Sequence, residues 1–377
     1  MGAPCVVVSG VRAPAALHAS RALAAAGYQV IGVDSLGFPL GRFSKSVVFE
    51  HIASPVYDWA GFERDVAAVI ERHQPVRWIA TCEEIFHLAR AAADLTALAD
   101  VLWAPALGTL LHAHNKHSFA ELARTLDGGE VDTRLLTSAD DLQPLRGLSR
   151  RLVFKPVYSR FAEHVLVRPF ADGLDAVRPT PARPWLAQTY LPGEELCAYA
   201  LAHDGKVTAQ TLYKGLYHAG RGASVFFEPA QDARISAFVE AYVAQTRWDG
   251  QLAFDFRRDA TGRPVAIECN PRATSGIHLW APDAALGHAL MGSNDSLSPE
   301  RRPQMVGSAM LAAGACHLSA YKTWRKHWDQ GQDVVRAGDD LGLWLGQPLA
   351  LMELGWQALR RRVSLLAAST HDIEWNL

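Results

Sequence analysis

Two short apolar runs, separated by a polar turn that contains a glycine, constrain the fold of this chain more than any other feature. The runs are residues 251–256 (Gln-Leu-Ala-Phe-Asp-Phe) and 265–270 (Val-Ala-Ile-Glu-Cys-Asn), and the turn spans residues 257–263. Short apolar segments on either side of such a turn are typical of a β-hairpin. The sequence therefore predicts two adjacent strands here.

One face of this hairpin is predicted to carry polar oxygen atoms. Side chains alternate between the two faces of a strand, so Glu268 and Asn270 share a face, and Asp255 lies on the partner strand. Arg272 follows the end of the second strand. The opposite face takes the apolar residues Phe254, Phe256, Ile267 and Cys269.

Two carboxylates and an amide oxygen on a rigid sheet suit a hard cation such as Mg2+ or Mn2+, which in turn holds phosphate groups. An alternative interpretation is that Asp255 and Glu268 are solvated residues on the exposed face of a half-buried sheet.

The composition and charge of the chain exclude several classes of protein. It has 377 residues, a formal net charge of -2 and a pI near 6.7. These values give no electrostatic case for binding nucleic acid or an anionic membrane. We find no apolar run of about 18 residues and no signal-peptide pattern, so no membrane span and no secretion are expected. The five cysteines form no Cys-x-x-Cys motif, which predicts reduced thiols in a cytoplasmic protein.

Residues 1–105 are predicted to form a Rossmann-like α/β domain. Residues 5–10 and 29–34 have the pattern of strands, and the Ala-rich segment 14–27 between them has the pattern of a helix. This βαβ unit is typical of a parallel, doubly wound sheet. Asp34 ends the second strand, where dinucleotide-binding folds place an acid on the ribose. The turn after Gly10 lacks the other two glycines of that fingerprint, however, so NAD binding is not expected.

Residues 106–292 are predicted to form an α+β unit, with lobes at 106–184 and 185–292, because runs of strands alternate with helices. A helix is expected over 111–126, which contains Lys116. Residues 293–377 are predicted to form a partly helical extension. We expect helices there over 305–320, which is almost wholly apolar and therefore buried, and over 349–366.

Taken together, these segments resemble the ATP-grasp superfamily, whose signature residues are matched in order between Lys116 and Arg272. The resemblance implies an ATP-grasp fold after a Rossmann-like domain, with Lys116 and Lys155 contacting the nucleotide. Such lysines are needed because ATP carries about four negative charges. Taken alone, either lysine is also compatible with a surface side chain whose ammonium group reaches water.

The same resemblance implies roles for the remaining site residues. The linker that contacts adenine is matched by Gln188, Tyr190 and Leu191. The acid that binds the ribose hydroxyls is matched by Glu195 or, alternatively, Glu194. The set that bridges the metal ions is matched by Asp255, Glu268 and Asn270. Arg272 matches the arginine that stabilises charge at the reacting phosphoryl and acyl groups.

One segment departs from the family pattern. Family members commonly carry a glycine-rich loop over the phosphates, whereas residues 157–164 contain no glycine. We expect a stiffer lid, in which Ser159 and Arg160 supply hydrogen-bond donors in place of backbone amides.

The resemblance also implies a reaction, in which ATP phosphorylates a carboxylate and an amine displaces the phosphate from the acyl phosphate. The alternatives are a small-molecule kinase and a non-catalytic nucleotide-binding protein. A small-molecule carboxylate and an amine are therefore the expected partners, together with a second copy of the chain, because homodimers are common.

Residues near the first sheet are candidates for binding the second substrate. Arg12 suits a carboxylate, and Glu83 and Glu84 suit an ammonium group, although these acids also favour the start of a helix. Further candidates for the acyl or phosphate pocket are His278, Lys214 and Arg221. Residues 370–377 either pack on the core or complete a substrate pocket.

Overall fold

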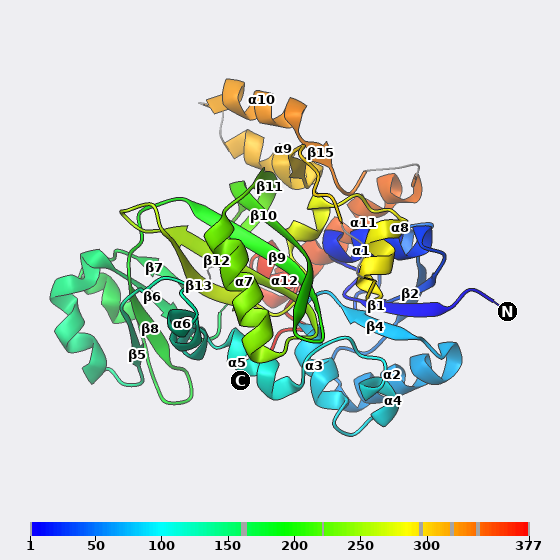
Figure 1. Ribbon diagram of the computed structural model, residues 1–377, viewed down its shortest axis with the longest axis horizontal. Helices are drawn as coiled ribbons and strands as arrows, with labels where there is room; N and C mark the ends of the chain where they lie inside the picture. The colour runs from blue at the N-terminus through cyan, green and yellow to red at the C-terminus, as the bar shows by residue number, and fades with distance from the viewer. Residues whose placement is uncertain are drawn as a thin grey trace.

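The computed structural model describes residues 2–159, 164–220, 222–293, 297–316, 320–336 and 340–375. The described strands form a parallel sheet and two further sheets that are almost wholly antiparallel (Figure 1). The parallel sheet lies at the N-terminal end of the chain, and the two other sheets lie beside one another in the remainder of the molecule.

The N-terminal sheet has the parallel order β3-β2-β1-β4. Its strands are β1 (Cys5–Ser9), β2 (Gln29–Asp34), β3 (Val48–His51) and β4 (Arg77–Ala80). Helix α1 (Pro14–Ala25) packs with Val6 and Val8 on one face of the sheet, and α2 (Trp59–His73) packs with Val7 and Ile31 on the other. Both faces are therefore covered, as predicted for a doubly wound sheet. The sheet is followed by α3 (Glu84–Ala91) and α4 (Thr96–Ala99).

The central sheet has seven strands in the order β13-β12-β9-β10-β11-β14-β15. Its long strands are β9 (Glu195–His203), β10 (Lys206–Ala219), β11 (Ala223–Ala230), β12 (Gly250–Arg258) and β13 (Pro264–Asn270). Helix α7 (Ala233–Thr246) covers one face, where Tyr242 contacts Phe254. Two short strands, β14 (Gln304–Met305) and β15 (Gln332–Asp333), extend the edge. The sheet therefore continues beyond the boundary predicted at residue 292.

The third sheet has the antiparallel order β5-β8-β6-β7. Its strands are β5 (Thr133–Leu136), β6 (Leu152–Pro156), β7 (Leu166–Val167) and β8 (Trp185–Thr189), with the 3-10 helices η2 (Asp140–Arg151) and η3 (Asp172–Ala176) alongside. Strand β8 pairs with both β5 and β6. The sheet thus includes a strand that lies past the lobe boundary predicted at residue 184.

The helix predicted over 111–126 is interrupted at Asn115. Helix α5 (Leu107–His114) ends there and α6 (Lys116–Thr125) begins. The side-chain oxygen of Asn115 accepts hydrogen bonds from the backbone N–H groups of His117 and Ser118, at 2.9 and 3.2 Å. Asparagine satisfies otherwise unpaired N–H groups at a helix start in this way. The consequence is that Lys116 occupies the first position of a helix.

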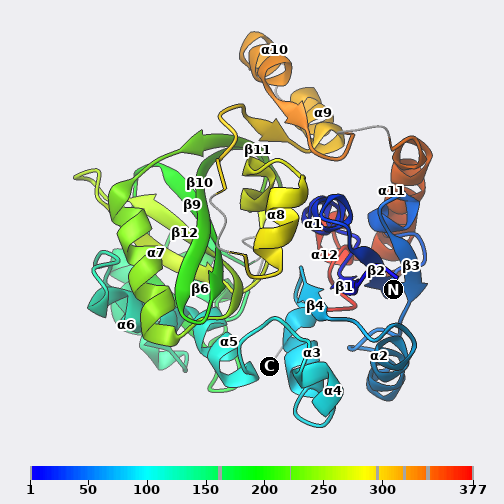
Figure 2. The same cartoon turned by 45° about the vertical axis from the view of Figure 1, so that its right-hand side comes forward.

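The C-terminal part of the described chain is helical (Figure 2). Its elements are η4 (Ser275–Leu279), α8 (Ala284–Leu290), α9 (Gly307–Cys316), α10 (Tyr321–Gln330), α11 (Gly342–Arg361) and α12 (Leu365–Ala368), and η1 (Leu40–Phe43) contacts α11. The helix predicted over 349–366 is two helices, because Arg362 adopts a left-handed conformation (φ 57°) and Ser364 caps α12.

The prediction that the whole helix over 305–320 is buried is wrong. Met310 is buried against Trp324, but Leu311 is exposed, because α9 packs along only one side. None of the helices in the described ranges combines the length and the apolarity that a membrane crossing requires.

Candidate nucleotide and metal site

The hairpin of β12 and β13 brings the predicted oxygen ligands together. Asp255 pairs with Glu268 in the register of the two strands, and Ala253 pairs with Asn270. The amide nitrogen of Asn270 donates a hydrogen bond to Asp255 Oδ2 at 3.1 Å. Phe254, Phe256 and Cys269 lie in the core, as alternation predicts. The sequence-based expectation that these oxygens share a face therefore agrees with the observed register.

Ile267 departs from simple alternation because the hairpin contains a β-bulge. Asp255 pairs with Glu268 and Phe256 with Ala266, so Ile267 is an extra residue on β13. Its side chain is half-buried, and its carbonyl oxygen lies 3.4 Å from Lys155 Nζ. The bulge therefore turns a backbone acceptor toward the neighbouring sheet, from which Lys155 comes.

Two buried lysines approach the hairpin from other elements. Lys116 begins α6, and its Nζ lies 3.5 Å from Glu268 Oε2 and donates to the carbonyl oxygen of Ser159 at 2.9 Å. Lys155 is on β6, and its contact with Ile267 connects two different sheets. The two lysine side chains are 4% and 6% exposed. This burial excludes the surface alternative for both, since a buried ammonium group needs an anionic or strongly polar partner.

The charged groups perturb one another strongly. Burial and the neighbouring Glu268 raise the pKa of Asp255 to about 7. Burial, together with Lys116, lowers the pKa of Lys155 to about 8, although Glu268 acts in the opposite direction. For Glu268, burial raises the pKa, but Lys116 and Lys155 outweigh burial and leave the pKa lowered. Two adjacent carboxylates repel each other when both are ionised, and two ammonium groups lie beside them. Such a site is suited to bind a cation at the carboxylates and an anion at the ammonium groups.

The donor set fits a divalent cation only in combination with other ligands. No cluster of three or more His, Cys, Asp or Glu with metal-binding geometry occurs in the described part of the chain. Asp255 and Glu268 would supply two carboxylates and Asn270 an amide oxygen, which here faces Arg272 Nη2 at 3.3 Å. Mg2+ commonly binds one or two carboxylates and takes its remaining ligands from phosphates and water. The raised pKa of Asp255 agrees with such a role, because a cation would offset the repulsion between the carboxylates.

The predicted adenine linker lies at and after the end of β8. Gln188 is buried and donates to Thr133 Oγ1 at 3.0 Å, so its side chain is used within the sheet. The guanidinium of Arg168 lies 5.2 Å from the ring centre of Tyr190, and Leu191 is buried. These residues are placed on one short segment, but their contact with adenine stays a prediction.

The two glutamates proposed for ribose differ in how firmly they are held. Glu194 forms an ion pair with Lys214 at 2.8 Å and lies 3.7 Å from Arg258 Nε. Glu195 lies 3.9 Å from both His218 and Arg257. A carboxylate without a short ion pair is more available to a ligand, which favours Glu195, the better match to the family pattern.

At the carboxyl edge of the N-terminal sheet, Arg12 is already paired within the chain. Its guanidinium contacts Asp34 and Asp372, each at a shortest distance of 2.5 Å, and donates to the carbonyl oxygen of Ser369. The pKa of Arg12 is raised, because the two carboxylates outweigh burial, which alone lowers the pKa. The predicted carboxylate-binding arginine therefore has two intramolecular carboxylate partners.

Glu84 joins the ends of β1 and β4. Its Oε1 accepts from Ser9 Oγ at 2.8 Å and from the backbone N–H groups of Thr81 and Cys82, and burial raises its pKa. Oε1 also lies close to Gly10, where φ is +72°, so a side chain at position 10 would collide with it. These contacts support the alternative in which Glu84 organises the start of α3, and a substrate role stays a prediction.

The C-terminal tail covers this same edge. Ser54 donates to the carbonyl oxygen of Asp372 at 2.6 Å, and the backbone N–H of Trp375 lies 3.4 Å from Glu83 Oε2. The Trp375 ring packs against Phe86 and His87. Figures 1 and 2 draw the last described part of the chain beside α3 and α5. The tail, of which residues 376 and 377 lie outside the described ranges, therefore packs where the second substrate was predicted.

Cys82 connects this edge to Arg272. Burial and Glu84 raise the pKa of the Cys82 thiol to about 12, and the guanidinium groups of Arg12 and Arg272 both act to lower it. The Cys82 thiol therefore lies close enough to both arginines for each guanidinium to act on its pKa.

Other sequence candidates lie elsewhere. His278 is buried in the core, 4.8 Å from the ring of His18 and 5.9 Å from that of Phe227, and burial lowers its pKa. The structure therefore does not bring His278 to the lysines and carboxylates. Arg160 and Arg221 lie outside the described residues. Ser159 takes part through its carbonyl oxygen, while its hydroxyl lies 3.4 Å from the Pro156 carbonyl oxygen.

Solved structures of known enzymes align with most of the chain. An L-amino acid ligase from Bacillus licheniformis is 16% identical and matches 80% of each chain, with a TM-score of 0.59. An N5-carboxyaminoimidazole synthetase from Staphylococcus aureus is 13% identical, with 85% of this chain and 86% of that chain covered and a TM-score of 0.62. A biotin carboxylase from Campylobacter jejuni is 12% identical, with 78% and 72% covered and a TM-score of 0.59. All three have the ATP-grasp fold.

The chain has the ATP-grasp fold.

This ATP-grasp assignment rests on structure, since no protein-family model and no curated protein sequence matches the chain. It confirms the superfamily resemblance predicted from the sequence at the level of the fold. The residues that match the ATP-grasp pattern lie on β6, β8, β12, β13 and the start of α6.

Sequence reasoning missed several residues that shape the site of this ATP-grasp chain. Gln251 donates from Nε2 to the Ala80 carbonyl oxygen at 3.1 Å and accepts from Tyr199, so it joins β12 to the end of β4. Asp372 completes the Arg12 cluster from 360 residues away in the sequence. Only the cap at Asn115 had a local signal, namely an asparagine before a helical pattern.

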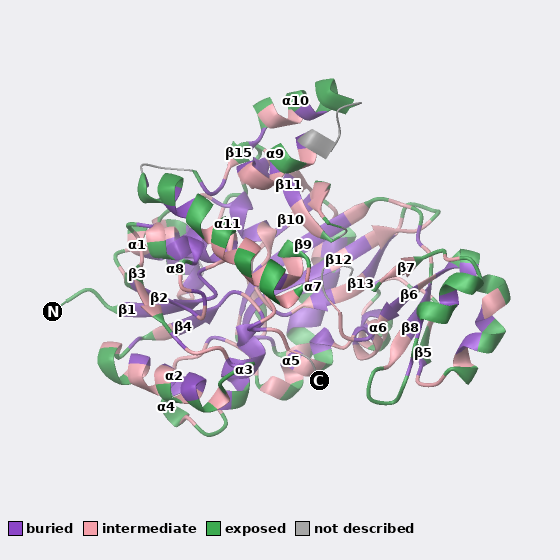
Figure 3. Cartoon of the chain, turned by 180° about the vertical axis from the view of Figure 1, so that it is seen from behind, coloured by how far each residue is buried: buried purple, intermediate pink, exposed green. Residues whose placement is uncertain are grey.

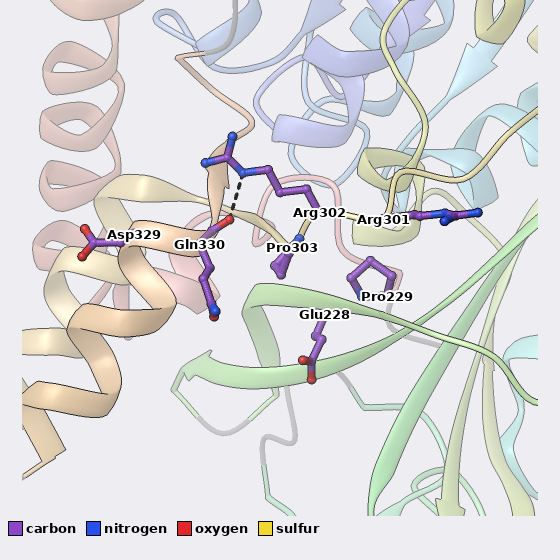
Figure 4. A pocket seen from close by; sticks show the side chains of 7 residues that line it. All are labelled: Glu228, Pro229, Arg301, Arg302, Pro303, Asp329 and Gln330. Carbon is purple, nitrogen blue, oxygen red and sulfur yellow. Dashed lines mark hydrogen bonds between the residues drawn. The ribbon is translucent and has the colours of Figure 1, made fainter.

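A shallow hollow of about 430 Å³ lies away from these residues, where β11 meets the C-terminal extension (Figure 4). Arg302 closes one side by donating from Nε to the Gln330 carbonyl oxygen at 2.9 Å. None of the candidate site residues lines it.

Proposed function

We propose that this protein is an ATP-dependent ligase that activates a carboxylate as an acyl phosphate and joins it to an amine. The observation that carries the proposal is the convergence of Lys116 and Lys155 on Glu268, beside Asp255, between two sheets. Two buried cations and two carboxylates on rigid elements suit a nucleotide triphosphate with its metal ion. The fold shared with three ATP-grasp ligases supports the same chemistry.

In the proposed reaction, a carboxylate oxygen of the first substrate attacks the γ-phosphorus of ATP, and ADP leaves. The nitrogen of the amine then attacks the acyl carbon, phosphate leaves, and the nitrogen loses a proton. Mg2+ held by Asp255, Glu268 and Asn270 would neutralise phosphate charge during transfer. Lys116 and Lys155 bind the phosphates, and Arg272 stabilises the negative charge that develops beside them.

The first experiment supplies purified protein with ATP, Mg2+ and pools of L-amino acids, which are tried first because one structural neighbour is an L-amino acid ligase. We expect release of ADP and phosphate that requires both an acid and an amine, with a product mass equal to their condensation. A stable phosphorylated product formed without an amine would instead identify a kinase. Tight ATP binding without turnover would identify a non-catalytic binding protein.

The matching variant is Glu268→Gln, which keeps the size of the side chain and removes its charge. We expect turnover to fall on the order of 10²–10³-fold, as when one transition-state contact is removed, while the melting temperature stays within a few degrees. Glu240→Gln, on the exposed side of α7, is the control and should retain full activity. Wild-type rates in Glu268→Gln would show that the metal assignment is wrong.

A further inference from the structure

The outer face of α11 is apolar although it lies at the surface. Four residues that follow one another along this face are each more than half exposed, namely Leu345 (77%), Met352 (68%), Trp356 (64%) and Leu359 (75%). Leu349, in the same row, is 42% exposed. Figure 3 shows α11 with exposed residues along the side that faces away from the molecule. We call the five residues Leu345, Leu349, Met352, Trp356 and Leu359 the α11 row. A solvated helix normally presents charged residues on such a face.

The opposite face of α11 is firmly packed, so the orientation of the helix is well determined. Leu343 is buried with Leu17 and Leu40, and Gly346 lies so close to Phe43 that a side chain would collide there. The carboxylate of Glu353 accepts from the backbone N–H groups of residues 37 and 38, each at 2.8 Å. The helix therefore cannot hide its outer face by rotating.

The charged residues of the helix do not relieve this exposure. Its sequence contains Glu353, Arg360 and Arg361 as the only charged side chains. Glu353 points toward the N-terminal domain, and the guanidinium of Arg361 lies 4.2 Å from the ring centre of Tyr57. Arg360 alone is exposed, at one end. The helix itself therefore places almost no charge along the α11 row. Arg336, from the segment before the helix, lies 4.1 Å from the ring centre of Trp344, beside the first residue of the row.

The spacing of the α11 row is that of a helix-pairing seam. Residues 345, 349, 352, 356 and 359 alternate in steps of four and three, which is the repeat that keeps one face of a helix against a partner helix. The row is also nearly symmetric about Met352, because Leu345 and Leu359 are each seven residues away. A two-fold axis at Met352 would therefore set apolar residues of one copy opposite apolar residues of the other.

We propose that a second copy of this chain docks antiparallel on the α11 row, with the two-fold axis near Met352. Leu345 of each copy then packs against Leu359 of the other, and Leu349 packs against Trp356. Complete burial of the row together with the neighbouring Leu341 and Trp344, both more than half exposed, would remove at most on the order of 800 Å² per copy from water. That is about the area each partner contributes to a stable interface and exceeds the roughly 300–600 Å² apolar patch of a typical monomer.

A lipid bilayer fits this face less well. Helices that lie on membranes carry lysine and arginine along the polar face beside the apolar one. In α11 that side is packed against the protein, and the only neighbouring basic run, Arg360-Arg361-Arg362, lies at one end. The dimer proposal does not depend on the reaction, because it uses none of the proposed site residues.

The first test is the oligomeric state of the full chain, measured by sedimentation over a range of concentrations. We expect a dimer whose dissociation constant rises at least about 30-fold in Met352→Arg, as for the loss of a central interface residue. Phe170→Arg is the matched control, because Phe170 is also 68% exposed but lies outside α11. Unfolding curves that superimpose for the wild type and both variants show that folding is unaffected.

A cross-linking test determines the direction of the helices. Under mild oxidation, Met352→Cys should form a disulfide between copies, because equivalent residues meet only near the two-fold axis. Leu345→Cys alone should not, whereas a mixture of Leu345→Cys and Leu359→Cys chains should. The wild type, whose described cysteines are largely buried, corrects for background.

Three results would overturn the proposal. One is a wild-type chain that stays monomeric at every concentration. Another is a dimer whose stability does not change in Met352→Arg. The third is a monomeric chain that sediments with anionic vesicles because it binds them with the face that contains Met352. That result would assign the face to membrane binding.

Discussion

This protein buries polar side chains in two different ways. Between the sheets, Lys116 Nζ lies 3.5 Å from Glu268 Oε2, and Glu268 pairs with Asp255 in the strand register. Lys155 Nζ lies 3.4 Å from the carbonyl oxygen of the preceding residue, Ile267. At the edge of the N-terminal sheet, by contrast, the guanidinium of Arg12 forms short, bidentate ion pairs with the carboxylates of Asp34 and Asp372. In the first group, burial and a like charge raise the pKa of Asp255 and lower that of Lys155. In the second group, contacts between opposite charges raise the pKa of Arg12 and lower that of Asp372.

The difference separates residues that are prepared for a ligand from residues that hold the fold. A buried ion pair with complete hydrogen bonding has nothing further to gain from a ligand. A cluster with loosely paired cations and crowded carboxylates gains when phosphate and a divalent cation arrive. The buried pair His18 and His278 belongs to neither group, because burial lowers the pKa of both rings and His18 Nε2 is hydrogen-bonded to the Trp280 carbonyl oxygen at 2.9 Å.

The largest effect is expected for Asp255→Asn. Turnover should fall on the order of 10²–10³-fold if the carboxylate holds the catalytic metal. The melting temperature without Mg2+ should stay the same or rise, because one of two adjacent buried carboxylates is removed. Parallel measurements of phosphate release and thermal unfolding check both parts. A destabilised but fully active variant would show instead that Asp255 stabilises the fold and does not hold a catalytic metal.

The pH dependence of stability should report the histidine pair. Burial lowers the pKa of His18 to about 4, from an ordinary value of 6.5. The unfolded chain therefore binds a proton that the folded chain resists, and stability is lost as the pH falls from about 6.5 toward 4. The loss attributable to His18 is on the order of 3 kcal/mol.

Denaturant titrations at several pH values measure this slope. His18→Gln, which can still donate to the Trp280 carbonyl oxygen, should flatten it, and His51→Gln, at an exposed position, should not. Equal slopes in all three proteins would remove His18 from the account.

A smaller loss is expected for Asp372→Asn. Arg12 keeps Asp34 but loses a second buried carboxylate, so the free energy of unfolding should fall by about 2 kcal/mol. Asp175→Asn breaks the exposed pair with Arg146 and should cost less than about 1 kcal/mol. Chemical denaturation compares the two. A change in Asp372→Asn no larger than the control would mean that the tail does not stabilise this edge.

The smallest effect is expected at the proposed ribose-binding position. There, Glu195 has no short ion pair, whereas its neighbour Glu194 is paired within the chain. Glu195→Gln should weaken ATP binding about tenfold, as for one hydrogen bond to a charged group. Glu194→Gln should leave binding nearly unchanged, because Glu194 is engaged by Lys214. Calorimetric titration with a non-hydrolysable ATP analogue distinguishes them. The reverse ranking would exchange the two assignments.

Local patterns predicted the parts of the fold whose signals are local. The hairpin over residues 251–270 and the first βαβ unit appear where alternation and helical spacing placed them. The break at Asn115 is concealed by helical periodicity that continues through it, although an asparagine before a helical segment is itself a capping signal. The bulge at Ile267 has no such signal, since it arises from how β13 pairs with β12.

Alternation along two strands is a local property, so the sequence alone predicts that oxygen ligands share one face and core residues the other. The order of the lysines and the arginine, which resembles that of ATP-grasp proteins, is also visible in the sequence. Which charges are already paired becomes visible only once the chain is folded. Arg12 has the same sequence context whether it binds a substrate or Asp372, and their contact joins positions 360 residues apart. The row on α11 shows the same limit, because helical spacing is identical for a buried face and an exposed one. Burial and pairing are properties of the packed chain, since they depend on what the rest of the molecule places beside each side chain.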